Sequence, residues 1–346
     1  MKQFQKVNSN SSLSGIIRSS NEDFIVDEIQ VFNPSGQGEH VWLKIKKTGE
    51  NTDWVAGLLA KIADVPRRDV SFAGMKDRNA VTTQWFSVQM PGREAPDWQA
   101  ELPESIQILE EKRHDRKLRR GTLEGNTFKI IIRQFKGSEE ELKATVKQIK
   151  EQGIPNYFGE QRFGFFNQEQ DKYLNIIKAE QWFKGEFKVK SRPKRSIYLS
   201  AARSWIFNHI LSERVKNSTW NQAVTGDVFM LDGSKSCFTG VLDDTISERI
   251  QQQNLHLTGA LWGKGELLSE AAVADAERAI SIDLAILSKG LEDKGLKQER
   301  KALRLRVQNL SYEFIENDTV CLQFSLPAGA FATSVLSEIG AFSSII

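Results

Sequence analysis

The sequence has 346 residues, of which 40% are hydrophobic and 27% are charged, proportions typical of a folded globular protein and not of a disordered chain. A chain of this length favours about two domains. No stretch reaches the roughly 18 uninterrupted apolar residues of a membrane helix, and the first residues lack the apolar segment of a secretory signal. The net charge of +2 excludes a protein that is polycationic as a whole.

Cysteine and histidine are too few and too scattered for a disulfide framework or a metal site. Cys237 and Cys321 lie far apart without a C-x-x-C partner, and the sequence contains only four histidines. We therefore expect no metal, and a cytoplasmic protein fits best. Residues 262–265 (W-G-K-G) lack the spacing of a phosphate loop, so we predict no nucleotide site there.

The first half of the chain predicts alternating strands and helices. Apolar residues at helical spacing predict a helix that is capped by Asn51 or Thr52 and ends at Pro66. The apolar run 70–73 and the alternating residues 86–90 predict two strands, which makes residues 75–84 the polar connection between them. A further strand is predicted at 127–133, followed by a helix from a capping box at Ser138 and Glu141 to Gly153.

The pattern changes after Pro155. Residues 155–300 are mostly helical in pattern, with helices predicted at 200–215 and 269–287. Strand patterns return at 303–307 and 320–326, and a short helix follows them. Strands on both sides of a helical middle predict an α+β domain interrupted by an inserted domain, with parts 1–153, 154–301 and 302–346.

Positive charge is concentrated in two segments. Residues 112–120 contain six Lys or Arg and one Asp, and a second basic run extends from Lys184 to Arg195. Such clusters are typical of a phosphate-binding surface. On charge alone, a solvated surface or a mobile loop explains them equally well.

The densest polar cluster is residues 74–84, in the predicted connection between two strands. An aspartate in such a loop is most often a turn residue, but Asp77 lies between Lys76 and Arg78. A carboxylate is ionised at neutral pH and can act as nucleophile or base if it is held in place. Lys76, Arg78 or an arginine distant in the sequence could hold it through charge-assisted hydrogen bonds.

Six sequence blocks occur in order from residue 21 to residue 333. Residues 73–84 contain the pattern G-x-K-D-x-x-A-x-T-x-Q, and residues 155–164 read P-N-Y-F-G-E-Q-R-F-G. The other four are E-D-F-x-V-x-E in 21–28, G-E-H with K-x-G-x-N-T in 38–52, H-x-x-K-L-x-x-G-x-L-x-G-N-x-F in 114–128, and L-P-A-G-A-F-A-T in 326–333. Together they resemble the TruD family of tRNA pseudouridine synthases.

This resemblance implies both a fold and a reaction. The fold is the pseudouridine synthase fold, a mixed β-sheet flanked by helices, interrupted by an inserted TruD-specific α/β domain. The reaction isomerises uridine to pseudouridine in tRNA, at position 13 of the D arm, without a metal or cofactor. The expected partner is tRNA, with no membrane and no obligatory protein partner.

The resemblance also implies residue roles. Asp77 matches the catalytic aspartate, which attacks covalently or abstracts a proton, and the sequence leaves both possibilities open. Phe331 matches an aromatic residue that stacks on the uracil, and Phe24 and Asn126 match residues of the same pocket. A uridine flipped out of folded RNA needs such a stacking face and hydrogen bonds to its edge. Without the motifs, both phenylalanines would be assigned to the core.

Three basic residues complete the predicted RNA contacts. Lys76 and Arg78 flank Asp77, and His114 lies in the first basic segment. The alternative to an enzyme is a non-catalytic RNA-binding protein on the same scaffold, which would have lost the aspartate or the stacking aromatic. The sequence retains Asp77 and Phe331, so it favours the enzyme.

Overall fold

The computed structural model describes residues 4–31 and 33–345, and these form two compact units. The sheet unit consists of residues 11–146, 307–332 and 339–345, and the insert unit consists of residues 4–10, 147–306 and 333–338. Both contain helices and strands, which confirms the predicted α+β class. The three-part domain division at residues 153 and 301 stays a prediction.

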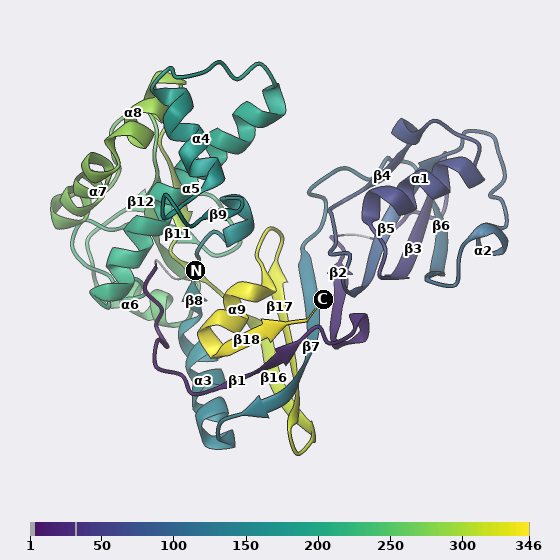
Figure 1. The fold of residues 1–346 in the computed structure, drawn as a ribbon, viewed down its shortest axis with the longest axis horizontal. Helices are drawn as coiled ribbons and strands as arrows, with labels where there is room; N and C mark the ends of the chain where they lie inside the picture. The colour runs from purple at the N-terminus through teal and green to yellow at the C-terminus, as the bar shows by residue number, and fades with distance from the viewer. Residues whose placement is uncertain (1–3, 32, 346) are drawn as a thin grey trace. The chain divides into compact units, whose positions relative to one another are not determined.

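The described residues of the sheet unit form one mixed ten-stranded sheet (Figure 1). Its main path is β16-β17-β7-β2-β5-β3-β6, while β1 pairs with β7 and β18, and β4 pairs with β5. β2 runs parallel to β5, and β1 runs parallel to β18. The strands are β1 (Ser14–Ile17), β2 (Phe24–Ile29), β3 (His40–Thr48), β4 (Val70–Phe72), β5 (Val81–Gln89), β6 (Ile106–His114), β7 (Gly125–Lys136), β16 (Gln308–Glu316), β17 (Thr319–Pro327) and β18 (Ala341–Ser344).

Helix α1 (Thr52–Ile62) packs its apolar face on this sheet. Val55 and Leu59 are fully buried in one cluster with Leu43 and Phe86, and burial of a side chain of this size stabilises the fold by about 1.5–3 kcal/mol. Of the two predicted caps, Asn51 is the one that caps the helix, and its side chain accepts a hydrogen bond from the backbone N–H of the second residue of the helix. The other helices are α2 (Trp98–Glu101) and two that contain residues of both units, α3 (Glu139–Gln152) and α9 (Ala332–Ile339).

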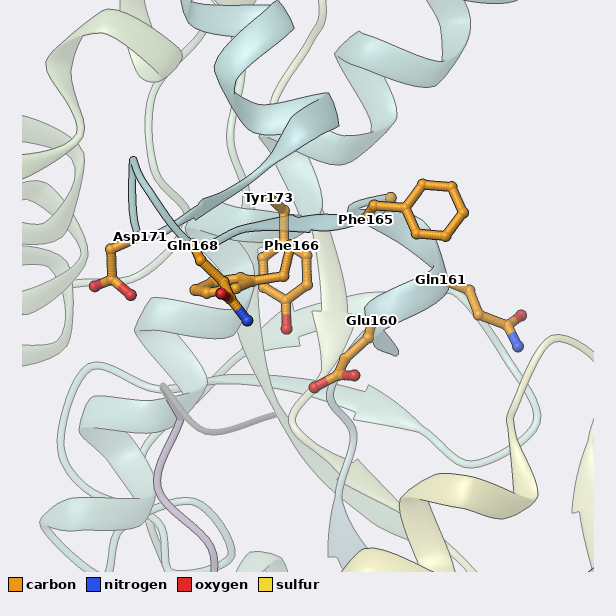
Figure 2. A pocket seen from close by; sticks show the side chains of 8 residues that line it. Glu160, Gln161, Phe165, Phe166, Gln168, Asp171 and Tyr173 are labelled. Carbon is orange, nitrogen blue, oxygen red and sulfur yellow. The ribbon is translucent and has the colours of Figure 1, made fainter. Parts of the chain in front are cut away.

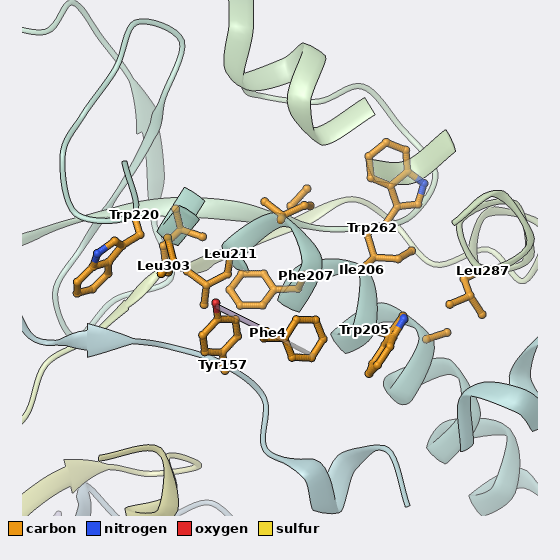
Figure 3. Packing of buried hydrophobic residues seen from close by; sticks show 14 of the residues in the cluster. Phe4, Tyr157, Trp205, Ile206, Phe207, Leu211, Trp220, Trp262, Leu287 and Leu303 are labelled. Carbon is orange, nitrogen blue, oxygen red and sulfur yellow. The ribbon is translucent and has the colours of Figure 1, made fainter. Parts of the chain in front are cut away.

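The insert unit packs helices against a four-stranded sheet of order β12-β11-β13-β14. Its core surrounds the 25-residue helix α5, whose Trp205 and Phe207 pack among the apolar residues labelled in Figure 3. The helices are α4 (Leu174–Phe183), α5 (Arg192–Lys216), α6 (Asp244–Gln251), α7 (Ala271–Asp283) and α8 (Ala285–Asp293). The strands are β11 (Val228–Leu231), β12 (Cys237–Thr239), β13 (Leu255–Leu261), β14 (Glu299–Ala302), and the short pairs β8 (Ile154–Pro155) with β15 (Arg304–Leu305) and β9 (Phe166–Asn167) with β10 (Lys172–Tyr173).

Several elements differ from the sequence-based expectations. β5 begins at Val81, so the connection after β4 is residues 73–80 and not 75–84. The first half of β5, residues 81–85, is buried on both faces and therefore lacks the apolar–polar alternation that predicted the strand at 86–90. The predicted helix 269–287 is two helices, α7 and α8, which break at Leu284. None of the helices in the described ranges is long and apolar enough to cross a membrane.

Candidate active site

Asp77 lies in the loop between β4 and β5, and buried side chains fix the shape of this loop. The fully buried Thr52 hydroxyl accepts a hydrogen bond from the Lys76 backbone N–H at 3.1 Å and donates one to Gln84 Oε1 at 3.0 Å. The Gln84 side-chain amide in turn donates to the Gly74 carbonyl at 3.0 Å. These hydrogen bonds join the first residue of α1, strand β5 and the Asp77 loop in one polar network.

The arginine that holds Asp77 is Arg18, which follows strand β1. Its Nη2 lies 2.6 Å from Asp77 Oδ2. Its guanidinium also lies 4.0 Å from the centre of the Phe24 ring. This stacking fixes the plane of the guanidinium group. The backbone of Arg18 is left-handed, with φ of 55°, a conformation that costs a non-glycine residue free energy and often occurs at functional sites.

Lys47 approaches the same loop from strand β3. Its Nζ donates to the Glu50 carbonyl at 2.7 Å and to the Asp77 carbonyl at 3.2 Å. Burial lowers the pKa of Lys47 to about 8, although the Asp77 carboxylate opposes this shift. The ammonium therefore places positive charge on the backbone that carries the carboxylate.

Lys76 and Arg78, the neighbours of Asp77, point to other partners. Lys76 Nζ lies 2.9 Å from Glu28 Oε2 in an ion pair that is almost completely buried. Burial raises the pKa of Glu28, and the charge of Lys76 opposes this shift. Arg78 is exposed, and its Nε donates to the Gly49 carbonyl at 3.3 Å. Lys76 therefore anchors the loop to β2, whereas Arg78 remains accessible to a ligand.

The predicted pocket residues lie on the strands beside this loop. Phe24 begins β2, is 2% exposed and packs against Arg18. Asn126 of β7 pairs with Glu28 of β2, so the Lys76–Glu28 contact connects the Asp77 loop to the strand that carries Asn126. Asn126 Oδ1 is buried and has no hydrogen-bond partner among the described residues. This oxygen could therefore accept a hydrogen bond from a bound ligand.

Phe331 lies in the turn that follows β17, five residues after Leu326, which pairs with Asn126. Its side chain is 40% exposed. An exposed aromatic ring close in sequence to a pocket strand can offer its face to a base. The strand order β17-β7-β2-β5 therefore gathers the segments that carry Phe331, Asn126, Phe24 and Asp77 in one part of the sheet.

His114, the remaining predicted contact, lies elsewhere in the sheet unit. It ends β6 opposite His40 of β3, which pairs with Gln89 at the far end of β5 from the Asp77 loop. At about 3.3 Å per residue, the strand length separates His114 from that loop by about 25 Å. The His114 ring is buried against Trp42, with ring centres 4.7 Å apart. Its contact with RNA stays a prediction.

The P-N-Y-F block at 155–164 lies in the insert unit and is held by internal hydrogen bonds. Asn208 of α5 bonds both the N–H and the carbonyl of Phe158, at 2.9 and 3.0 Å. Gln161 lines a cavity of about 950 Å³ together with Phe165, Phe166 and Tyr173 (Figure 2). The block therefore serves the packing of this unit, with Gln161 at its surface.

Two residues of the site were absent from the sequence-based predictions. Nothing local in the sequence distinguishes Arg18, because its role depends on a partner 59 residues away. Lys47 belongs to the K-x-G-x-N-T block, but β3 also contains Lys44 and Lys46, so only the fold distinguishes Lys47 as the buried lysine. In the described ranges, no three His, Cys, Asp or Glu side chains gather in a way that could hold a metal ion.

Comparison with known proteins gives matches along most of the chain. Residues 4–172 and 166–339 match the family model described as tRNA pseudouridine synthase D (TruD). The chain is 47% identical to tRNA pseudouridine synthase D of Methylococcus capsulatus over 329 residues, which is 95% of this chain and 91% of the relative. It is 41% identical to the protein of that name from Hydrogenovibrio crunogenus over 326 residues, 94% of this chain and 92% of the relative.

A solved structure shows the same fold. The chain superposes on the crystal structure of a putative tRNA pseudouridine synthase D from Methanosarcina mazei with a TM-score of 0.76. The two chains are 21% identical, and the match covers 97% of this chain and 95% of the other. This likeness confirms the predicted mixed sheet flanked by helices.

Proposed function

Because the chain belongs to the TruD family of tRNA pseudouridine synthases, we propose that it isomerises uridine to pseudouridine in tRNA with Asp77 as the catalytic carboxylate. The proposed target is position 13 of the D arm, and the proposed reaction uses no cofactor. The observation that supports the role of Asp77 is its ion pair with Arg18 on a loop fixed by buried hydrogen bonds.

The reaction conserves every atom of the uridine. The bond between N1 and the ribose C1′ breaks and a bond between C5 and C1′ forms, after which C5 loses its hydrogen as a proton and N1 gains a proton. Neither an oxidant nor a second substrate is needed for this balance. The protein must supply a charged group beside the sugar and a site in which the uracil can turn.

Asp77 is suited to the first of these tasks. Arg18 binds Oδ2, whereas Oδ1 has no hydrogen-bond partner among the described residues, and the side chain is half exposed. A held, ionised carboxylate with one oxygen open to the ligand can attack carbon or accept a proton. Arg18 and Lys47 place positive charge beside it.

The pocket residues are suited to the second task. A flipped uracil needs an aromatic face and a hydrogen-bond partner for its edge. The exposed Phe331 ring supplies a face, and the Asn126 amide supplies an acceptor and donors for the uracil edge. Phe24 backs Arg18 from the core side and so keeps the ion pair in place during the reaction.

The test is pseudouridine mapping on unmodified tRNA transcripts, with the wild-type protein, Asp77→Asn and Asp77→Ala. We expect conversion at position 13 by the wild type alone, with both variants at background. Conversion at another position that still depends on Asp77 would retain the chemistry and refute the target. Conversion by the variants at the wild-type rate would refute the role of Asp77, and binding without any conversion would indicate a non-catalytic RNA-binding protein.

A further inference from the structure

The insert unit contains a cavity with aromatic and cationic walls, where α4 ends and α5 begins. This cavity of about 540 Å³ is bounded by two half-buried aromatic rings, Trp182 and Phe187. Three cationic side chains, Lys188, Arg195 and Lys294, share its wall. The cavity therefore combines ring faces with positive charge.

The positive charge continues over the surface around this cavity. Residues 184–195 contain six Lys or Arg and a single acid, Glu186. All six cations are exposed, and among the described residues none of them forms an ion pair. Cations that are left unpaired in the folded protein are available to an external anion. We name residues 182–195 with Lys294 the basic–aromatic surface.

The rings of this surface are themselves in contact with lysines. Lys294 Nζ lies 5.1 Å from the centre of the Trp182 ring, and Lys178 Nζ lies 5.6 Å from the centre of the Phe187 ring. Such contacts hold ammonium groups beside the ring faces. The first turn of α5 contains no acidic residue, so the positive end of the helix dipole adds to the same field.

We propose that the basic–aromatic surface binds an unpaired nucleotide of the tRNA, with the base stacked at Trp182 and Phe187 and the flanking phosphates on Lys188, Lys190 and Lys194. This proposal rests on the proposed function, because it assumes tRNA as the ligand. Grooves that bind single-stranded RNA combine these same parts, a cationic track for the backbone and aromatic rings for the bases. A surface that is only solvated needs no aromatic cavity among its lysines.

Equilibrium binding of an unmodified tRNA transcript tests the cationic part. The triple variant Lys188→Gln, Lys190→Gln, Lys194→Gln is compared with Lys150→Gln, Lys235→Gln, Lys264→Gln, which removes three exposed lysines from the same unit outside this surface. Each lost phosphate contact lowers the slope of log Kd against log salt by about 0.7–0.9. We expect the slope of the first variant to fall by about 2–3 and its affinity near 0.15 M salt to fall about 10–100-fold, with the control unchanged.

The aromatic part is tested with Phe187→Leu, which keeps the apolar volume and removes the ring. We expect an affinity loss of about fivefold or more with an unchanged salt slope, because stacking does not release counterions. An unchanged affinity of Phe187→Leu would overturn the stacked base, and equal binding by the two triple variants would overturn the whole surface.

Measuring tRNA conversion separately from tRNA binding distinguishes this proposal from the proposed function. At saturating enzyme, the first triple variant is expected to convert bound tRNA at the wild-type rate, since it changes binding and not chemistry. If the wild type binds tRNA but converts none, the proposed function fails while the binding comparison still decides the surface. A conversion rate at saturation that falls as far as the affinity would overturn a role limited to binding.

Discussion

Arg18 Nη2 lies 2.6 Å from Asp77 Oδ2, although 59 residues separate the two in the chain. The Phe24 ring holds the guanidinium in position from the side of the core. This ion pair joins the residue after β1 to the loop before β5 and holds the Asp77 carboxylate in position. The neighbours of Asp77 do not hold it, because Lys76 binds Glu28 and Arg78 binds the Gly49 carbonyl.

Arg18→Lys keeps the positive charge but loses the planar fork and its stacking on Phe24. We expect single-turnover conversion to slow about 10–100-fold, because a carboxylate that is less well positioned loses transition-state stabilisation. The Kd for tRNA should change less than threefold. Rapid-quench assays with excess enzyme measure both quantities, and a wild-type rate for Arg18→Lys would contradict the positioning role.

We predict that Lys47 makes the stability of the sheet unit depend on pH. Burial lowers its pKa from 10.5 to about 8, so between these values the unfolded chain holds a proton that the folded chain has released. The free energy of unfolding therefore gains a contribution that rises as pH increases through this range. Below pH 8, the folded protein bears the cost of the buried charge in full.

The measurement is urea unfolding of the wild type and Lys47→Met at several pH values. Relative to the variant, the wild type should gain on the order of 1–2 kcal/mol between about pH 7 and about pH 10. The exposed Lys46 on the same strand supplies the control Lys46→Met. A difference between wild type and Lys47→Met that stays constant with pH would refute this prediction.

Thr52→Val removes the hydroxyl that connects Lys76 and Gln84 while keeping the shape of the side chain. We expect the free energy of unfolding to fall by about 1–3 kcal/mol, because buried polar groups of the loop lose their partner. Conversion should fall as well, since the loop carries Asp77.

Thr82→Val is the matched control for this change. Thr82 is equally buried, but its hydroxyl has no hydrogen-bond partner among the described residues. The same substitution there should leave the free energy of unfolding unchanged or raise it. Urea unfolding of both variants decides the matter, and equal losses would contradict the network.

Phe331→Ala should separate activity from stability. The side chain is 40% exposed, so its loss should change the free energy of unfolding by less than about 1 kcal/mol. If its ring stacks on the uracil, conversion should slow about 10–100-fold, in line with about 1–3 kcal/mol for one stacked base. Phe331→Tyr keeps the ring and should retain most of the activity, whereas equal losses in both variants would argue against stacking.

Sequence patterns predicted the elements whose signals are local. Helix α1 was predicted from apolar spacing with Asn51 or Thr52 as its cap, and the structure confirms the helix and has Asn51 as the cap. Strand β17 was predicted from strict alternation. In contrast, the first half of β5 is buried on both faces, so only residues 86–90 alternate and the start of the strand was not predicted. The extent of this strand depends on pairing with strands distant in the chain.

For the candidate site too, sequence patterns located the parts with local signals and missed a contact between distant residues. The motif block located the Asp77 loop, and the K-x-G-x-N-T and T-x-Q blocks now have a structural reason in the Thr52 and Gln84 hydrogen bonds. The sequence left open which cation holds Asp77, because Lys76 and Arg78 are adjacent to it while Arg18 is not. Only the fold of β1 and β2 against β7 brings the distant arginine into reach.

Two strand pairs, β7 with β17 and β1 with β18, join strands that are synthesised far apart in time. The first strand of each pair leaves the ribosome long before its partner. Eight residue pairs join β7 to β17, and the whole of residues 147–306 is synthesised between these two strands. On the ribosome, one edge of β7 therefore stays unpaired while the insert unit emerges and folds. Such an edge can pair with other chains, so we expect a nascent chain paused before residue 319 to engage chaperones and to lose that affinity once β17 has emerged.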